Sequence, residues 1–298
     1  MYSIETLQWK DYSSWVEHCG SVFGGTGAAY FNRHVVNDPH RNMDSIFLIK
    51  QDGIIAATVR VFQRHIFIDG KKYKMGGIGE VSTKEQFRGK GMSYEILAHC
   101  VKYMKENDFD LSMLGTGYFG HYKKHGFLQV PMNFKRVEGG KIDGDAELRP
   151  LEFARDSSDA YKLYKKYSRL NNGAIARDFE YYICWSAAEM INPTGLFRNG
   201  ALVGYVCFDY HNVTELICAD EDVDILLGYL KPNEDGEICV YNNVKTSRTV
   251  KGTYSDDSHM VNLIKPFELG GKLIDNSDKL ADYLSNSGGI VFYSSDGF

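Results

Sequence analysis

Residues 88–93, of sequence RGKGMS, place two glycines and two cations where the pattern of the chain changes abruptly. The run before them, GIGEVST, ends in β-branched residues and predicts a strand. In the run after them, GMSYEILAHCVKYMKEN, apolar residues recur at helical spacing. The first amides of a helix lack partners and carry partial positive charge, so a strand, a glycine turn and a helix can bind an anion. The stretch is therefore either a phosphate-binding turn or an exposed turn with two solvated cations.

Glycine turns also divide the residues before this stretch into hairpins. Asp52-Gly53 and Asp69-Gly70 each separate two strand-like runs, and such Asp-Gly pairs are strong hairpin signals. After the helical run come a short apolar segment, FDLSML, and a turn into a further strand, HYKKHGFLQV. This mixture of hairpins and a crossover helix predicts an α/β chain with a mixed sheet.

A polar, glycine-rich segment, VEGGKIDGDAELRP, precedes a new helical pattern and predicts a domain boundary. We therefore divide the chain into residues 1–138, a linker at 139–149 and a second domain at 150–298. The run LFRNGALVGYVCF in the second part is similar to LIKQDGIIAATVRVF in the first. One hairpin match leaves an internal duplication open, and the glycine turn at 88–93 is not repeated.

Composition excludes several classes of function. The net charge of −5 lacks the basic excess that nucleic-acid binding needs. Six cysteines are scattered singly, without the Cys/His spacing of a metal site, which predicts free thiols in a reducing cytoplasm and no metal. No apolar run approaches membrane-spanning length, so we expect no membrane partner. The charge of −5 is compatible with a cationic substrate but is also an ordinary solubility charge.

Two motifs together resemble one known family. The spacing of RGKGMS excludes the nucleotide-binding P-loop and the dinucleotide-binding glycine pattern. It fits R-x-x-G-x-G/A, the acyl-CoA pyrophosphate loop of the GNAT N-acetyltransferase superfamily, with Ser93 in the last small position. Further on, the stretch from Tyr122 to Phe127 (YKKHGF) resembles the Y-x-x-x-G-F signature of that superfamily. The resemblance covers about residues 40–130.

A closer resemblance concerns the whole chain. The stretch LGTGYFGHYKKHGF, followed by a second half without the CoA loop, is similar to the enhanced-intracellular-survival (Eis) family. Members of that family combine an active GNAT domain, a degenerate GNAT domain and a domain similar to sterol carrier proteins. The resemblance therefore implies a degenerate GNAT-like domain in residues 150–298. The chain is too short for the complete third domain, so we expect a remnant or none. Family members assemble into multimers, which implies a homo-oligomer.

The resemblance implies transfer of an acetyl group from acetyl-CoA to a primary amine of a small, cationic acceptor. The acceptor would be similar to an aminoglycoside, a polyamine or lysine, and would attack directly in a ternary complex. The alternative is a non-catalytic acyl-CoA sensor or scaffold. The expected acetyl-CoA contacts are the backbone groups of Val81, Ser82 and Thr83 for the pantetheine arm, and Arg88, Gly89, Lys90, Gly91, Met92 and Ser93 for the pyrophosphate.

Three residues are candidates for proton transfer. The resemblance places the hydroxyl of Tyr122 near the CoA sulfur, where it would act as the general acid. Strand alternation puts Glu80 and Ser82 on one face of GIGEVST. If that face points away from the following helix, Glu80 lies on the acceptor side and would be the base, directly or through water. In the Eis family the terminal carboxylate enters the active site, so Phe298 is a rival base.

Overall fold

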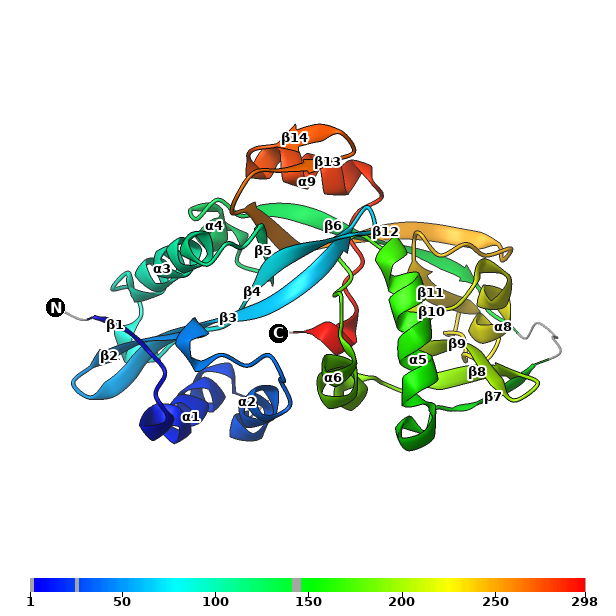
Figure 1. Cartoon of the computed structure of the whole chain (residues 1–298), viewed down its shortest axis with the longest axis horizontal. Helices are drawn as coiled ribbons and strands as arrows, with labels where there is room; N and C mark the ends of the chain where they lie inside the picture. Colours follow the sequence, from blue (N-terminus) through cyan, green and yellow to red (C-terminus); the bar gives the residue numbers. More distant parts are fainter. Residues whose placement is uncertain (1–2, 25–26, 141–145, 298) are drawn as a thin grey trace.

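The computed structural model describes residues 3–24, 27–140 and 146–297 of the chain. In that part of the chain a single twelve-stranded sheet runs through both halves of the sequence (Figure 1). Its order is β1-β2-β3-β4-β5-β12-β6-β11-β10-β9-β8-β7. Most neighbours are antiparallel, but β4 with β5 and β10 with β11 are parallel. The predicted α/β fold with a mixed sheet is therefore confirmed.

The first half contains the elements that the glycine pattern predicted. In chain order they are β1 (Ile4–Thr6), η1 (Trp9–Asp11), α1 (Tyr12–Phe23), α2 (Gly27–Val36), η2 (Met43–Ser45), β2 (Ile46–Gln51), β3 (Ile54–Ile68), β4 (Lys71–Thr83), η3 (Glu85–Phe87), α3 (Met92–Glu106), β5 (Leu111–Gly115), α4 (Phe119–Lys123) and β6 (Leu128–Glu138). Both expected hairpin turns form with positive φ at each residue: 53° and 77° at Asp52-Gly53, and 48° and 71° at Asp69-Gly70. Such angles match the twist of the flanking strands.

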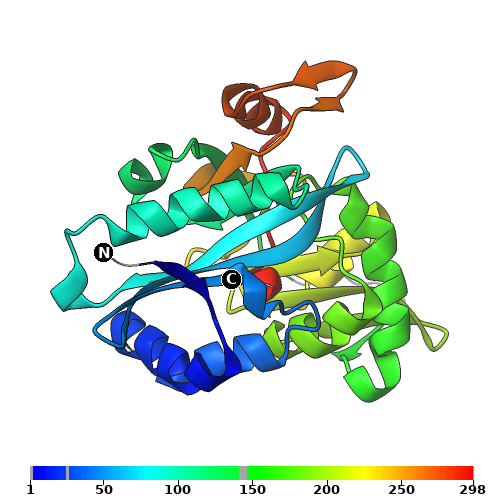
Figure 2. The ribbon, with the colours of Figure 1, turned by 60° about the vertical axis from the view of Figure 1, so that its left-hand side comes forward.

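Helices cover both faces of the first half of the sheet (Figure 2). Alternate residues of β2 show why: Phe47 and Ile49 join the core under α3, whereas Ile46 and Leu48 join the core under α1 and α2. Of the apolar residues of α3 at helical spacing, five are buried and Val101 is partly buried; the five are Met92, Ile96, Leu97, Cys100 and Met104. The sheet therefore has one face under α3 and an opposite face under α1 and α2.

The second half repeats the strand order of the first. Its elements are β7 (Glu147–Pro150), α5 (Phe153–Tyr167), η4 (Ser168–Leu170), α6 (Phe179–Tyr181), the π-helix η5 (Tyr182–Ser186), α7 (Ala187–Glu189), β8 (Thr194–Arg198), β9 (Ala201–Asp209), β10 (Asn212–Ile217), η6 (Asp220–Asp222), α8 (Val223–Leu227), β11 (Glu237–Tyr241), β12 (Val250–Leu263), β13 (Phe267–Leu269), β14 (Lys272–Ile274), α9 (Ser277–Asn286) and η7 (Ser294–Asp296). The hairpin β8–β9 followed by β10 and the parallel neighbour β11 corresponds to β2–β3, β4 and β5.

Strand β12 joins the two halves. Although it belongs to the second half of the sequence, it lies between β5 and β6 and pairs antiparallel with both. The end of the predicted linker is also structured, because β7 begins at Glu147 and pairs with β8. Residues 141–145 lie outside the described residues, and the boundary at 139–149 stays a prediction.

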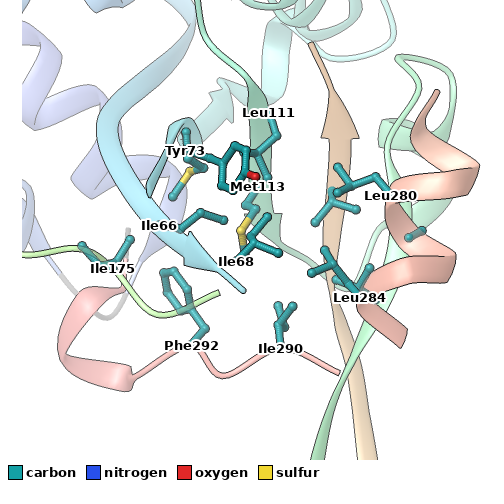
Figure 3. Close-up of a cluster of buried hydrophobic side chains, with 14 of the residues drawn as sticks. Ile66, Ile68, Tyr73, Leu111, Met113, Ile175, Leu280, Leu284, Ile290 and Phe292 are labelled. Atoms are coloured by element: carbon teal, nitrogen blue, oxygen red, sulfur yellow. The ribbon is translucent and has the colours of Figure 1, made fainter. Parts of the chain in front are cut away.

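The chain after β12 packs on this junction. The helix α9 contacts β6 and β12, and its Leu280 and Leu284 face Leu111 and Met113 of β5 (Figure 3). The segment after α9 adds Ile290 and Phe292 to the same buried cluster. It then runs to η7, which contacts β10, η5 and α7 (Figure 1). The two halves therefore share a hydrophobic core, and the C-terminal segment lies between them.

Candidate active site

The end of β4 is distorted where the candidate base lies. Arg60 of β3 pairs with Gly79 and Thr58 pairs with Ser82, so β4 carries one residue more than β3 between these pairs. Glu80 lies in this bulge with φ of 55°, an angle that residues other than glycine seldom adopt. Bulges and left-handed residues of this kind concentrate at functional sites, since the fold must hold them against their strain.

Beyond the bulge, β4 also separates from its parallel neighbour. The described pairing of β4 with β5 covers only residues 75–77 and 111–113. The edge of β4 facing β5 is therefore open at Val81, Ser82 and Thr83, the residues expected to bind a pantetheine arm. Their backbone groups on this edge can pair with the amides of an extended ligand, as a strand would.

The glycine turn forms one cavity with the start of α3. A cavity of about 300 Å³ is lined by all six residues of 88–93, together with Thr83, Phe87, Tyr94, His121 and Lys124. Gly89 and Gly91 have φ of 76° and 79°, and a Cβ atom added at either would meet nothing within 4 Å. Glycine is therefore favoured at these two positions by the positive φ angle rather than by lack of space, and the backbone amides beside it stay accessible. Together with Arg88 and Lys90 they make a site suited to a phosphate.

Tyr122 lies on α4, directly after His121, which lines this cavity. Its side chain is buried, and burial raises the pKa of its hydroxyl, with an opposing effect from the hydroxyl of Thr116. The hydroxyl therefore stays protonated at neutral pH and can donate a proton. The neighbouring His121 contacts Ser93 through Nε2 at 2.8 Å, which ties α4 to the start of α3.

Glu80 lies on the face covered by α1 and α2, as strand alternation predicted. It is 7% exposed, and its Oε1 is 3.4 Å from the guanidinium of Arg60. Its Oε2 has no hydrogen-bond partner among the described residues. Burial raises the pKa of Glu80 to about 7; Arg60 lowers it and Asp38 raises it further. A carboxyl group that titrates near neutrality and has a free oxygen can accept a proton from a bound amine.

A buried ion network holds this glutamate. Arg60 also binds Asp38 at 2.7 Å, and Arg64 binds the same oxygen of Asp38 at 3.0 Å. On the other side of the bulge, His18 of α1 contacts Ser82 Oγ at 3.0 Å and Ile55 O at 2.9 Å. Burial lowers the pKa of His18 to about 4, so the ring is neutral. Because a carbonyl only accepts, Nδ1 carries the proton and Nε2 accepts from the Ser82 hydroxyl.

Sequence reasoning missed Arg60, Asp38, Arg64 and His18. One signal was present: Arg60 and Arg64 interrupt an apolar strand pattern four residues apart, and therefore share one face. Two arginines on the buried face of a strand require acidic partners. The sequence did not show that Asp38, in a loop after α2, would be one of them.

A larger cavity borders the end of β5. It measures about 450 Å³ and is mainly lined by apolar and aromatic side chains from β5, β6, β10, β11, β12 and the C-terminal segment. Asp256 and His259 are polar groups in its wall, and Gly297 is its last residue. Phe298, the rival base, lies outside the described residues, so its role stays a prediction.

Among the described residues, no group of three or more histidine, cysteine, aspartate or glutamate side chains is placed to hold a metal ion. In the same part of the chain the cysteines are free. None of the helices described there is both long and apolar enough to cross a membrane.

Comparison with known proteins agrees with this geometry. Residues 3–130 match the family model described as an acetyltransferase (GNAT) domain. No curated protein sequence gives a match. A probable N-acyltransferase from Enterococcus faecalis is similar in structure, with a TM-score of 0.72 and 14% identity over 91% of this chain and 76% of the other. A GCN5-related N-acetyltransferase from Anabaena variabilis gives a TM-score of 0.69 and 13% identity over 91% and 76%.

Eis1 from Mycobacterium abscessus has a similar fold, with a TM-score of 0.61 and 12% identity over 89% of this chain and 74% of that one. At such low sequence identity, the similarity to these structures shows only a shared fold. The match of residues 3–130 to the family model identifies a GNAT acetyltransferase domain in this part of the chain, as the two sequence motifs predicted.

Proposed function

We propose that this protein transfers an acetyl group from acetyl-CoA to a primary amine of a small, cationic acceptor. One observation carries the proposal: the open edge of β4 leads from the phosphate-type cavity at residues 88–93 directly to the bulge that holds Glu80. A cofactor with a pyrophosphate, an extended amide arm and a terminal thioester would fit along this edge, with the pyrophosphate in the cavity and the thioester near the bulge. A yeast N-myristoyltransferase with bound myristoyl-CoA shares the fold, with a TM-score of 0.53 and 9% identity over 75% of this chain and 66% of that one.

The proposed reaction needs one base and one acid. An alkyl ammonium has a pKa of about 10.4, so it must lose a proton before it attacks. Glu80, directly or through water, would take that proton. The neutral amine then attacks the thioester carbonyl, the C–N bond forms and the C–S bond breaks. Tyr122 would give a proton to the leaving thiolate and recover one from the nitrogen, so the products are the amide, CoA thiol and one released proton.

The acceptor would enter through the cavity of about 450 Å³ at the end of β5. Its aromatic wall suits the apolar body of a ligand, and Asp256 suits a second cationic group. Because Gly297 lines this cavity, the terminal carboxylate of the next residue, Phe298, stays the rival base. We expect the reaction to take place in the cytoplasm, because the described cysteines are unpaired. A homo-oligomer stays a proposal from the family resemblance.

The alternative is an acyl-CoA sensor without turnover. Such a protein would need the turn at 88–93 but not a buried carboxyl with an unpartnered oxygen. Burying that group disfavours folding, so its presence supports the enzyme.

A thiol-release assay separates the two functions. Acetyl-CoA is mixed with the protein and a panel of primary amines containing an aminoglycoside, a polyamine and a lysine peptide. We expect at least one amine to accelerate release of CoA thiol, and Tyr122→Phe to slow it while acetyl-CoA still binds. Binding of acetyl-CoA without acceleration by any of these amines would favour the sensor.

A further inference from the structure

A bulge in β12 turns two polar side chains onto the same face of the sheet. Asp256 pairs with Met132 and His259 pairs with Val130, so β12 carries one residue more than β6 between these pairs. Without this extra residue, side chains three positions apart would point to opposite faces. Both Asp256 and His259 instead line the cavity of about 450 Å³ at the end of β5. Bulges that re-aim side chains in this way recur beside functional sites.

His259 lies at the end of this cavity where the thioester is expected. It pairs with Gly115, the last residue of β5, and its Nε2 would be 3.8 Å from a Cβ atom added there. The parallel pairing of β4 with β5 stops two residues before Gly115. If it continued, it would place Gly115 opposite Gly79, directly before Glu80 in the bulge of β4. His259 is therefore across the opening between β4 and β5 from the proposed base.

The imidazole of His259 can accept a hydrogen bond from an amine. Burial lowers its pKa below the ordinary value of 6.5, with an opposing effect from Asp256, so the ring is neutral at neutral pH. Its Nδ1 is 3.3 Å from the hydroxyl of Ser258. When Nδ1 donates its proton to that hydroxyl, Nε2 is left as the acceptor. A neutral acceptor beside Gly115 can hold the nitrogen of an amine that is about to react.

Asp256 makes the wall of this cavity acidic. It is the one acid among the described residues that line the cavity, and none of these is a lysine or an arginine. Its Oδ1 accepts a hydrogen bond from Ser258 N–H at 2.8 Å. The same wall carries the stacked rings of Phe134 and Tyr254, whose centres are 5.2 Å apart. A carboxylate that shares a wall with aromatic rings, and with no cation in that wall, suits an ammonium group.

We propose that Asp256 and His259 hold the two ends of an aliphatic diamine, free or as part of a polyamine. His259 binds the amine that reacts, and Asp256 binds an ammonium group further along the same ligand. This inference rests on the proposed acetyl transfer, and it assigns the choice of acceptor to β12, in the second half of the sequence.

The spacing of the two side chains selects the length of the diamine. Their partners Met132 and Val130 are two residues apart, so Asp256 and His259 are separated by about 7 Å along the strand. Three successive bonds in the trans arrangement span about 3.8 Å. The nitrogens of a four- or five-carbon diamine, five or six bonds apart, are therefore separated by about the same 7 Å.

Titration calorimetry of amines in saturating desulfo-CoA tests the inference on the full chain without any turnover. The ligands are 1,5-diaminopentane, the monoamine 1-aminopentane and the shorter 1,3-diaminopropane. Asp256→Asn removes the charge but keeps an oxygen for the Ser258 N–H. Asp257→Asn is its matched control, because Asp257 belongs to the same bulge but is exposed and does not line the cavity.

The histidine is tested in the same titrations. His259→Leu removes the hydrogen-bond acceptor, whereas His259→Gln keeps one on a side chain of similar length. His99→Leu is the matched control. His99 is also a half-buried histidine whose ring packs against a phenylalanine, but it lies on α3 and does not line the cavity.

We expect 1,5-diaminopentane to bind about tenfold more tightly than either other amine. Asp256→Asn should raise its dissociation constant about tenfold and leave that of 1-aminopentane unchanged. His259→Leu should weaken the binding of both amines, and His259→Gln should weaken it less. Equal affinity for the three amines, or equal effects in a variant and its control, would overturn the inference.

Thiol release from acetyl-CoA with the same amines separates this inference from the proposed function. Acetylation of amines without the preference for 1,5-diaminopentane would overturn the inference and leave the proposed function standing. The preference in binding, without acetylation of any amine, would support the diamine site and contradict the proposed function.

Discussion

The two halves of the chain place a glutamate at corresponding points of their sheets but surround it differently. In β4 the register shift contains Glu80, and in β10 a similar shift directly precedes Glu215. Within the described part of the chain, the carboxylate of Glu80 pairs with Arg60 at 3.4 Å, and its second oxygen has no partner. Both oxygens of Glu215 are bound, by Arg177 at 3.0 and 2.7 Å and by the hydroxyls of Tyr205 and Ser295. The first glutamate can exchange a proton, whereas the second is held as a structural ion pair.

The turns that follow these strands differ in the same way. In the first half two glycines and two cations precede α3, a helix of 15 residues. In the second half Asp220, Glu221 and Asp222 precede α8, a helix of five residues. A cavity of about 540 Å³ remains there, but Asp220, Glu221 and the C-terminal residues Val291 and Tyr293 are among its lining residues. Similar strand order therefore does not by itself supply a phosphate-type cavity; we attribute the proposed cofactor site to the turn residues and the free carboxyl of the first half.

The largest expected effect is on catalysis by the first glutamate. Glu80→Gln should lower kcat/KM for acetyl transfer about 10²–10⁴-fold, because an amide cannot accept the proton of the amine. Glu215→Gln, assayed where it is folded, should leave kcat/KM close to that of the unmodified protein. Steady-state kinetics of both variants checks this. Full activity in Glu80→Gln would remove Glu80 as the base and favour the terminal carboxylate.

The opposite contrast is expected for stability. Arg177→Met leaves Glu215 and Asp296 buried without a cationic partner, which should cost about 3–5 kcal/mol. Glu80→Gln should change stability far less, since the one ion pair that Glu80 makes with the described residues is long and its second oxygen has no partner among them. Urea unfolding at neutral pH measures both. Equal losses would mean that the two glutamates are structurally equivalent.

The pH dependence should link activity to stability through Glu80. Its pKa in the fold is about 7, above the ordinary value of 4.5, so ionisation disfavours the folded state. This contribution makes stability fall as the pH rises from about 4.5 through about 7, while kcat/KM rises over the upper part of that range. Both trends should be absent in Glu80→Gln. A pH–rate profile that keeps its acidic limb in the variant would assign that limb to another group.

The smallest expected effect concerns charge at the two turns. Lys90→Glu should weaken acetyl-CoA binding about tenfold, by removing a charged contact to phosphate. Asp220→Lys should confer no second binding site, because the segment from Cys218 to Val223 contains no glycine to expose its amides. Titration calorimetry gives both results as affinity and stoichiometry. A second acetyl-CoA site in Asp220→Lys would show that the charge of the turn alone decides which half binds acetyl-CoA.

The features that could be predicted from the sequence are local ones. The Asp-Gly hairpins, the glycine turn and the buried face of α3 each depend on residues within one short segment. The placement of β12 between β5 and β6 could not be predicted, because both partner strands lie more than 100 residues away in the sequence. The sequence pattern of β12 itself identifies neither partner. Nor could the link from Asp38 to Arg60 and Arg64, since a loop carboxylate has no periodicity that identifies its partner.

The central claim, that only the first half binds the cofactor, is tested most directly by calorimetric titration of acetyl-CoA and of desulfo-CoA. Gly91 and Gly200 make a matched pair: their φ angles are 79° and 78°, and a Cβ atom at either meets nothing within 4 Å. Glutamate at each position therefore introduces similar backbone strain and the same charge. We predict binding to the unmodified protein and to Gly200→Glu, and its loss in Gly91→Glu. No binding to the unmodified protein, or equal losses in both variants, would contradict the account.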